Sequence, residues 1–288
     1  MVGMTWGRCL GLCTLALVAF SATLLAAASP QLPLDVPFRL VGNSAPIVIV
    51  RIQDRDISLY LDIGSATPLV LQPALLAQLK TTPTGESFSG FGMEGKVFTA
   101  PLVTLDRVDM GGAVFSNVSV RRDEHDGSYQ DKQLAEAGTQ GSIGTELFKN
   151  YQLVLDYARH RMTLVVPGAP LSSSRHCRGQ IIPLVRDGNH WGLVSRVSTE
   201  TGERLFVWDT GSPAFVMPKA SAIAAHLDTS QDAVTLQHFR MNGHEFGPLR
   251  FEIWDFPAPA GMAGFIGRDF FAAHVVCIDF PGNRLFVR

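Results

Sequence analysis

The chain has 288 residues, of which 46% are hydrophobic and 17% are charged, and its formal net charge at pH 7 is −2. This is the composition of a globular protein long enough for one large domain or for two domains of ordinary size. The nearly balanced charge provides no basic footprint, so nucleic acid is excluded as an expected partner.

Residues 1–28 have the pattern of a signal peptide. Arg8 is the only charge ahead of an apolar run from Leu10 to Leu25, and a short run of alanines then ends at Ala28. Small residues in this place are typical of a signal-peptidase cleavage site. An apolar run of this length could also remain as a membrane anchor. We predict cleavage near Ala28 and a secreted or periplasmic protein, with membrane anchoring as the alternative.

A block in which a strand runs into a turn occurs twice, and each copy carries an aspartate. Residues 59–65 read Leu-Tyr-Leu-Asp-Ile-Gly-Ser, and residues 206–212 read Phe-Val-Trp-Asp-Thr-Gly-Ser. The apolar residues are typical of a strand, and the glycine permits a tight turn. A carboxylate in such a place is costly unless it is hydrogen-bonded or shares a proton. Asp62 and Asp209 are therefore our candidate catalytic residues.

Two further blocks recur in the same order. Residues 103–120 correspond without gaps to residues 234–251, and each copy contains a Gly-Gly or Asn-Gly pair that predicts a two-residue hairpin turn. The block Gly-Ser-Ile-Gly at 141–144 recurs as Gly-Phe-Ile-Gly at 264–267. Three blocks in one order predict an internal duplication of the chain.

The segment between the two copies, residues 167–174, is rich in Pro, Gly and Ser, which is typical of a linker. Nearly everything else consists of short strand-like runs. We therefore expect a mainly β protein with an N-terminal lobe at 29–168, a linker at 169–174 and a C-terminal lobe at 175–288. Each lobe is expected to be a small bent or closed β-barrel, related to the other by a pseudo-twofold axis.

The first copy holds an additional glycine-rich segment between its aspartate and the second block. We predict that this segment is a mobile hairpin, or flap, that covers an apolar ligand. An ordinary surface loop is the alternative. The residues expected to bind the ligand are Phe88, Gly90, Phe91, Gly92 and Met93.

Other chemistries have little support in the sequence. His244-Glu245 lacks the second histidine of a zinc motif, and we expect no metal and no cofactor. Beyond residue 28 only two cysteines remain, Cys177 and Cys277. In an exported chain they could form one disulfide, and two buried free thiols are equally compatible with the sequence.

Two such turns facing each other would form a carboxylate pair. Two unit charges about 4 Å apart repel by about 4 kcal/mol at an effective dielectric constant of about 20, so the pair retains one proton over a broad pH range. The ionised member can then take a proton from water while the protonated member donates to a carbonyl oxygen. We expect the amides of Gly64 and Gly211 to be open to approach and the hydroxyls of Ser65 and Ser212 to donate to the carboxylates.

Asp-Thr-Gly-Ser after an apolar strand, followed by the hydrophobic-glycine block, resembles the aspartic proteases. The Gly-x-Ile-Gly pattern is similar to the retropepsin-like branch, here with two lobes in one chain as in pepsin-like enzymes. The resemblance covers about residues 34–288. It implies a monomeric endopeptidase that needs no cofactor, with a cleft between the lobes that binds an extended peptide or protein substrate under one flap.

The first turn departs from this family pattern. In the family, a threonine after each aspartate braces the pair across the lobe interface, and Thr210 fits that role. Ile63 stands in the equivalent place of the first lobe and has no hydroxyl. We therefore expect a weaker or less rigid dyad. The candidate flap also lacks the tyrosine of pepsin-like flaps. The second hypothesis is accordingly a catalytically weak or inactive peptide-binding protein with the same fold.

Overall fold

The computed structural model describes residues 33–41, 45–91, 97–123, 134, 136–165, 177–185, 192–257 and 261–288. Several sequence-based expectations lie outside these residues. They are the signal peptide at 1–28, the linker at 169–174, Gly92, Met93 and the side chain of Phe91.

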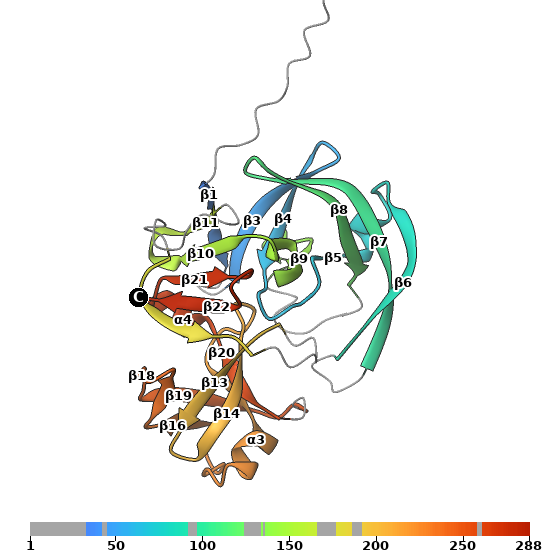
Figure 1. Cartoon of the computed structure of the whole chain (residues 1–288). Coiled ribbons are helices and arrows are strands. Elements are labelled where there is room, and N and C mark those ends of the chain that lie inside the picture. The colour runs from blue at the N-terminus through green and yellow to red at the C-terminus, as the bar shows by residue number, and fades with distance from the viewer. Residues whose placement is uncertain are drawn as a thin grey trace, which may run out of the picture.

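The protein is mainly β, as the sequence predicts, and its strands form three sheets (Figure 1). The central sheet has six strands in the order β1-β11-β10-β21-β22-β12. The two copies meet in it, because β10 of the first copy pairs antiparallel with β21 of the second. Its strands are β1 (Leu34–Pro37), β11 (Arg161–Val165), β10 (Gln152–Asp156), β21 (Val276–Asp279), β22 (Arg284–Val287) and β12 (Gln180–Pro183).

The N-terminal lobe is a curled eight-stranded sheet in the order β2-β3-β4-β9-β5-β8-β7-β6. The burial of alternate residues along β4 is typical of a strand with one face on the core. Its strands are β2 (Arg39–Val41), β3 (Ala45–Ile52), β4 (Arg55–Leu61), β9 (Gly141–Ile143), β5 (Leu69–Leu71), β8 (Ala113–Arg122), β7 (Val97–Met110) and β6 (Thr82–Phe91).

The C-terminal lobe repeats this plan with the order β16-β19-β15-β20-β14-β13-β17-β18. Strands β13, β14, β15 and β20 stand where β3, β4, β5 and β9 stand in the first lobe. The strands are β16 (Ala233–Leu236), β19 (Leu249–Trp254), β15 (Val216–Pro218), β20 (Met262–Ile266), β14 (Gly202–Trp208), β13 (Leu193–Thr199), β17 (Phe239–Met241) and β18 (His244–Glu245).

Helices are short and lie at the ends of strands. One cluster of buried apolar side chains runs through all three sheets, so the lobes and the central sheet share one core. The helices are α1 (Pro73–Leu76), α3 (Lys219–Ala224), α4 (Arg268–Ala273) and the 3₁₀ turns η1 (Thr145–Phe148) and η2 (Tyr157–Arg159).

Both predicted hairpin turns form. Gly111 and Gly112 have positive φ between β7 and β8, and Asn242 and Gly243 have positive φ between β17 and β18. Positive φ at both central residues is what a two-residue turn of this type requires. The repeated second block therefore folds in the same way at its turn in both lobes.

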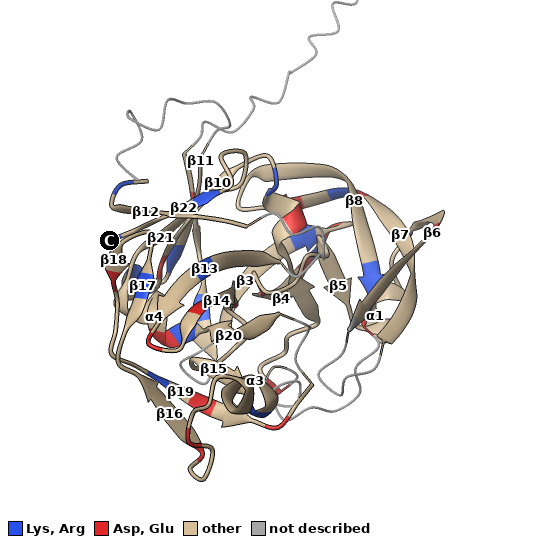
Figure 2. Ribbon diagram, turned by 60° about the horizontal axis from the view of Figure 1, so that its bottom comes forward, with Lys and Arg blue, Asp and Glu red and all other residues tan. Residues whose placement is uncertain are grey.

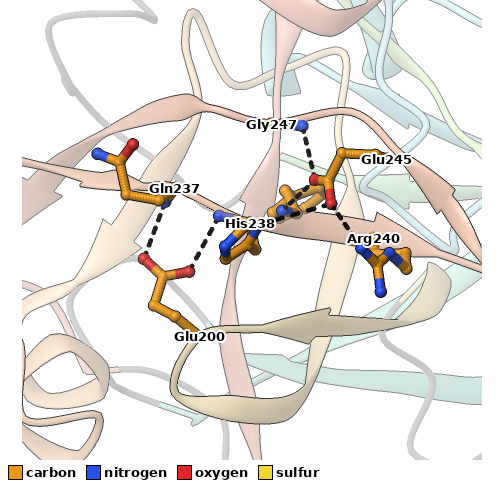
Figure 3. A network of polar contacts seen from close by, with 7 residues as sticks. Glu200, Gln237, His238, Arg240, Glu245 and Gly247 are labelled. Carbon is orange, nitrogen blue, oxygen red and sulfur yellow. Dashed lines mark hydrogen bonds and ion pairs between the residues drawn. The ribbon is translucent and has the colours of Figure 1, made fainter.

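The two lobes differ on either side of that turn. In the first lobe β7 is continuous over 14 residues, whereas the second lobe divides the same stretch into β16 and β17. Two carboxylates hold the divided region together (Figure 3). Glu200 accepts from the amides of Gln237 and His238, and Glu245 accepts from the amide of Phe239 and pairs with Arg240.

Cys177 and Cys277 form a disulfide. Cys277 lies on β21 in the central sheet, and Cys177 lies just ahead of β12 at its edge. The bond therefore fastens the start of the second copy to the sheet that joins both copies, which resolves the alternative that the sequence left open.

Basic and acidic residues are interspersed along the strands of both lobes (Figure 2). Among the described residues, no helix has the length and apolar character needed to cross a membrane.

Candidate active site

The structure places Asp62 and Asp209 at the ends of equivalent strands, β4 and β14. The amide of Asp62 donates to the carbonyl of Ile143 at 2.8 Å, and that of Asp209 donates to Ile266 at 3.0 Å. The acceptors belong to β9 and β20, which run parallel to β4 and β14. The hydrophobic-glycine block of each copy thus fixes the position of the aspartate in the same copy.

The glycines that end these two blocks allow the turns to pack closely. A Cβ atom on Gly144 would collide with the carbonyls of Ser65 and Thr67, and one on Gly267 would collide with that of Ala214. The residue after each glycine donates its amide to the turn. Thr145 donates to the carbonyl of Ser65, and Arg268 donates to the carbonyl of Ser212. These contacts form the rigid support behind each aspartate.

The two carboxyl groups meet across the lobe interface, and the side chains of Asp62 and Asp209 are within hydrogen-bonding contact. Each also lies over the glycine of the opposite turn. A Cβ on Gly64 would be 2.5 Å from Oδ1 of Asp209, and a Cβ on Gly211 would be 3.1 Å from Oδ1 of Asp62. This crossed arrangement requires glycine at position 64, leaves little room for a side chain at position 211, and brings together the pair that the sequence singled out.

Backbone amides bind each carboxyl from its own turn. Gly64 donates to Oδ1 of Asp62 at 3.0 Å, and Gly211 donates to Oδ1 of Asp209 at 2.7 Å. These short bonds stabilise the ionised form of each group.

The expected role of the serine hydroxyls needs correction. The hydroxyl of Ser212 donates to the carbonyl of Ala214 at 2.9 Å, and that of Ser65 accepts from the amide of Thr67 at 3.4 Å. Both hydroxyls face the chain just beyond the turn because the turn brings that backbone closer than the carboxylates. The serines reach the aspartates through their backbone amides instead.

Only the C-terminal lobe supplies a side chain that hydrogen-bonds the turn of the opposite lobe. The hydroxyl of Thr210 donates to the carbonyl of Leu61 at 2.6 Å and accepts from the amide of Ile63 at 3.1 Å. Thr210 is 1% exposed, so both bonds are shielded from water. The side chain of Ile63 is fully buried among apolar side chains and has no polar group with which to bond the opposite lobe.

A tyrosine that the sequence analysis did not select completes the site. The hydroxyl of Tyr60, at the end of β4, donates to Oδ2 of Asp62 at 3.2 Å. Residues two apart on a strand point to the same face, so a tyrosine two places before the aspartate was a signal available in the sequence.

Burial and mutual repulsion hold protons on the pair. Both aspartates are half-buried, and desolvation of the carboxyl groups is the largest influence on the pKa of each. Burial, and then the charge of Asp62, raise the pKa of Asp209 to about 8. Burial also raises the pKa of Asp62 above its ordinary value, opposed first by the bond from Tyr60. The pair therefore combines one ionised and one protonated carboxyl between the ionisation of Asp62 and that of Asp209.

The predicted flap residues have separate places. Phe88 and Gly90 lie on β6, which with β7 forms a hairpin (Figure 1). The ring of Phe88 packs against Phe98, and the guanidinium of the buried Arg121 lies 5.6 Å from the first ring and 4.8 Å from the second. A Cβ on Gly90 would strike both rings. The structure thus places Phe88 and Gly90 in a packed layer near the turn end of the hairpin.

A cavity of about 470 Å³ begins directly beyond the Asp62 turn. Ala66, Thr67 and Pro68 line one wall, Phe88 of the hairpin lines another, and Tyr151 closes a third. A larger hollow of about 780 Å³ lies at the β12 edge of the central sheet and contains neither aspartate. Neither cavity is lined by Asp62 or Asp209, and the smaller one is lined by the residues that follow the Asp62 turn. Within the described residues no group of three or more metal-ligating side chains gathers.

The fold can be compared with that of solved structures. The structure is similar to that of an aspartic proteinase from Irpex lacteus, with a TM-score of 0.57 and 16% sequence identity over 88% of this chain and 96% of that chain. No family model matches the sequence, and no curated protein does. At this identity the likeness establishes the fold. The chain therefore has the two-lobed fold of the aspartic proteinases.

Proposed function

We propose that the protein is an aspartic-type endopeptidase that hydrolyses peptide bonds with a water molecule activated by Asp62 and Asp209. A single observation carries this proposal, namely that two carboxyls from twofold-related turns are in contact and each lies over the glycine of the other turn. A structural aspartate would gain nothing from a second buried carboxylate, whereas acid–base catalysis needs such a pair.

In the proposed reaction, the ionised carboxylate takes a proton from water and the oxygen attacks the carbonyl carbon of the peptide bond. The protonated carboxyl gives its proton to the carbonyl oxygen, which yields a tetrahedral diol. Transfer of a proton to the nitrogen then breaks the carbon–nitrogen bond and releases one carboxyl and one amine product. The chemistry requires no cofactor.

The proposed substrate is a peptide bound in extended form, with an apolar side chain in the cavity beside Pro68, Phe88 and Tyr151. The apolar part of the lining, which includes Pro68, Phe88 and Phe115, supports an apolar preference. The protein is proposed to act as a monomer outside the cell or in the periplasm. The disulfide supports an oxidising location, and anchoring by residues 1–28 is the alternative.

The decisive experiment is hydrolysis of a denatured protein at several pH values, with and without pepstatin, by the wild type and by Asp62→Asn and Asp209→Asn. Either substitution should lower the rate by between about a hundredfold and ten-thousandfold, because one acid–base group is lost. The matched control is Asp228→Asn at an exposed aspartate, which should leave the rate unchanged. Activity that resists both pepstatin and Asp209→Asn would reject the proposal.

The second candidate function is peptide binding without hydrolysis, and the one-directional brace at Ile63 favours it. The two functions separate in one assay. A catalytically silent binder would bind pepstatin or a denatured peptide at the carboxyl pair, and cleavage products would not accumulate.

A further inference from the structure

The strongest difference between the two halves of the site lies two residues before each aspartate. Tyr60 pairs with Ser142 on β9, and Val207 pairs with Phe265 on β20. These are equivalent places on equivalent strands, so the pseudo-twofold axis relates a tyrosine on one side to a valine on the other. A hydroxyl donor therefore stands beside one carboxyl and an alkyl group beside its partner.

The hydrogen bonds to the two carboxyls follow this difference. Asp62 accepts at both oxygens, from the amide of Gly64 at Oδ1 and from the hydroxyl of Tyr60 at Oδ2. Asp209 accepts from the amide of Gly211 at Oδ1. Among the hydrogen bonds of the described residues, no side chain other than Asp62 reaches the carboxyl of Asp209. The tyrosine also occupies the place at the carboxylate that sequence reasoning gave to the hydroxyl of Ser65.

The position of Tyr60 is fixed by packing. Its ring contacts a small buried cluster of Ala45, Ile47 and Leu134, next to the strand that carries Asp62. A donor held in this way gives up little rotational freedom when it binds the carboxylate. A hydrogen bond to an ionised acceptor is stronger than one to a neutral acceptor. Tyr60 therefore favours the state in which Asp62 is the ionised member.

We propose that Tyr60 is a positioning residue that keeps Asp62 ionised as the water-activating base and leaves the shared proton on Asp209. This inference rests on the proposed function for its catalytic meaning, but its proton assignment is independent of turnover. The nearest other ionisable groups are Tyr157, whose pKa the charge of Asp209 raises, and Arg268, whose charge opposes that rise. Neither forms a hydrogen bond with Asp62 in the described part of the chain.

Tyr60→Phe tests the assignment because it removes the hydroxyl and keeps the ring. In the wild type, the hydroxyl of Tyr60 binds the Asp62 carboxylate both when the pair holds one proton and when it holds none. The alkaline limb of the kcat/KM profile reports the loss of that last proton, so it should stay at the same pH in the variant. The acid limb reports the ionisation of Asp62, which the hydrogen bond from Tyr60 favours. On the acid side kcat/KM should fall about tenfold, with a plateau close to that of the wild type.

Tyr157→Phe is the matched control, because it removes a buried hydroxyl that has no hydrogen-bond partner among the described residues and that is not one of the groups shifting the pKa of Asp62. It should move neither limb. A shift of the alkaline limb in Tyr60→Phe would place the shared proton on Asp62 and overturn the proposal. An equal loss of rate at every pH, with unmoved limbs, would also overturn it, because that result describes a structural role.

A second measurement needs no activity. The unfolding free energies of the wild type and Tyr60→Phe should be compared by denaturant titration across the pH range. Loss of the hydroxyl raises the pKa of Asp62 in the folded state further above its unfolded value. The variant should therefore lose additional stability as the pH rises through the ionisation of Asp62 and lose no more beyond it. A stability difference that does not vary with pH would contradict the proton assignment even if hydrolysis were never detected.

Discussion

The two strand-to-turn blocks share the residues that fix the position of each aspartate. They differ in the residues that favour its ionisation and that bond the opposite lobe. Both have the aspartate, the glycine amide that binds it and the backbone bond from the neighbouring strand. One block has Tyr60 and Ile63, and the other has Val207 and Thr210 at the same places. The comparison indicates that a nearly symmetric backbone can hold a pair whose two members do different work.

The largest expected loss of rate comes from replacing the glycine of either turn, and the loss should differ between the two turns. Gly64→Ala would place a methyl group 2.5 Å from Oδ1 of Asp209, whereas Gly211→Ala would place one 3.0 Å from the nearest carboxyl oxygen. Displacing a reacting group by about 1 Å can cost about a hundredfold in rate, so Gly64→Ala should lose at least that much. Peptide hydrolysis measures it, with near-ultraviolet circular dichroism to check folding. Equal losses in the two variants would contradict the tighter contact at Gly64.

A smaller effect is expected when the brace is removed. Thr210→Val leaves the buried carbonyl of Leu61 and the buried amide of Ile63 without their partner. The unfolding free energy should fall by about 2–4 kcal/mol in a denaturant titration. Thr235→Val, on an exposed strand position, is the matched control and should change stability little. A loss as small as that of the control would mean that the brace contributes nothing.

The smallest effect is expected from restoring the brace in the other direction. Ile63→Thr supplies a hydroxyl at the cost of apolar burial, so the net change in unfolding free energy should stay within about 1 kcal/mol while kcat rises. Ile63→Val loses the same bulk without adding a hydroxyl, and the difference between the two variants isolates the new bond. If Ile63→Thr gains neither rate nor stability over Ile63→Val, the missing hydroxyl is irrelevant to the dyad.

Internal repetition made most of the fold predictable. The blocks around Asp62 and Asp209, the paired hairpin turns and the two hydrophobic-glycine segments each recur, so a local signal that is weak alone is confirmed by its copy. Mainly β lobes with equivalent strands follow from that pattern, and the structure has them. The repeat also made the contact between the two carboxyls an expectation, since equivalent turns face each other when they lie next to the axis that relates the lobes.

The features that the sequence did not reveal depend on contacts between distant or unrepeated residues. Pairing of β10 with β21 joins the copies in the central sheet, and no local pattern encodes which strands meet there. Which group a serine hydroxyl bonds depends on the exact torsion angles of the turn, which the sequence does not give. The expected bonds from Ser65 and Ser212 to the carboxylates were therefore wrong. Tyr60 was overlooked because its counterpart, Val207, has no polar group to repeat the signal.

The tyrosine beside a single carboxyl has an evolutionary consequence. In an assembly of two identical subunits, one codon change alters both sides of the site, so any such donor would appear twice. A gene that encodes both halves in tandem removes that constraint, because each half can mutate alone. The joined architecture thus permits a division of labour between the acids that a symmetric pair of subunits cannot inherit.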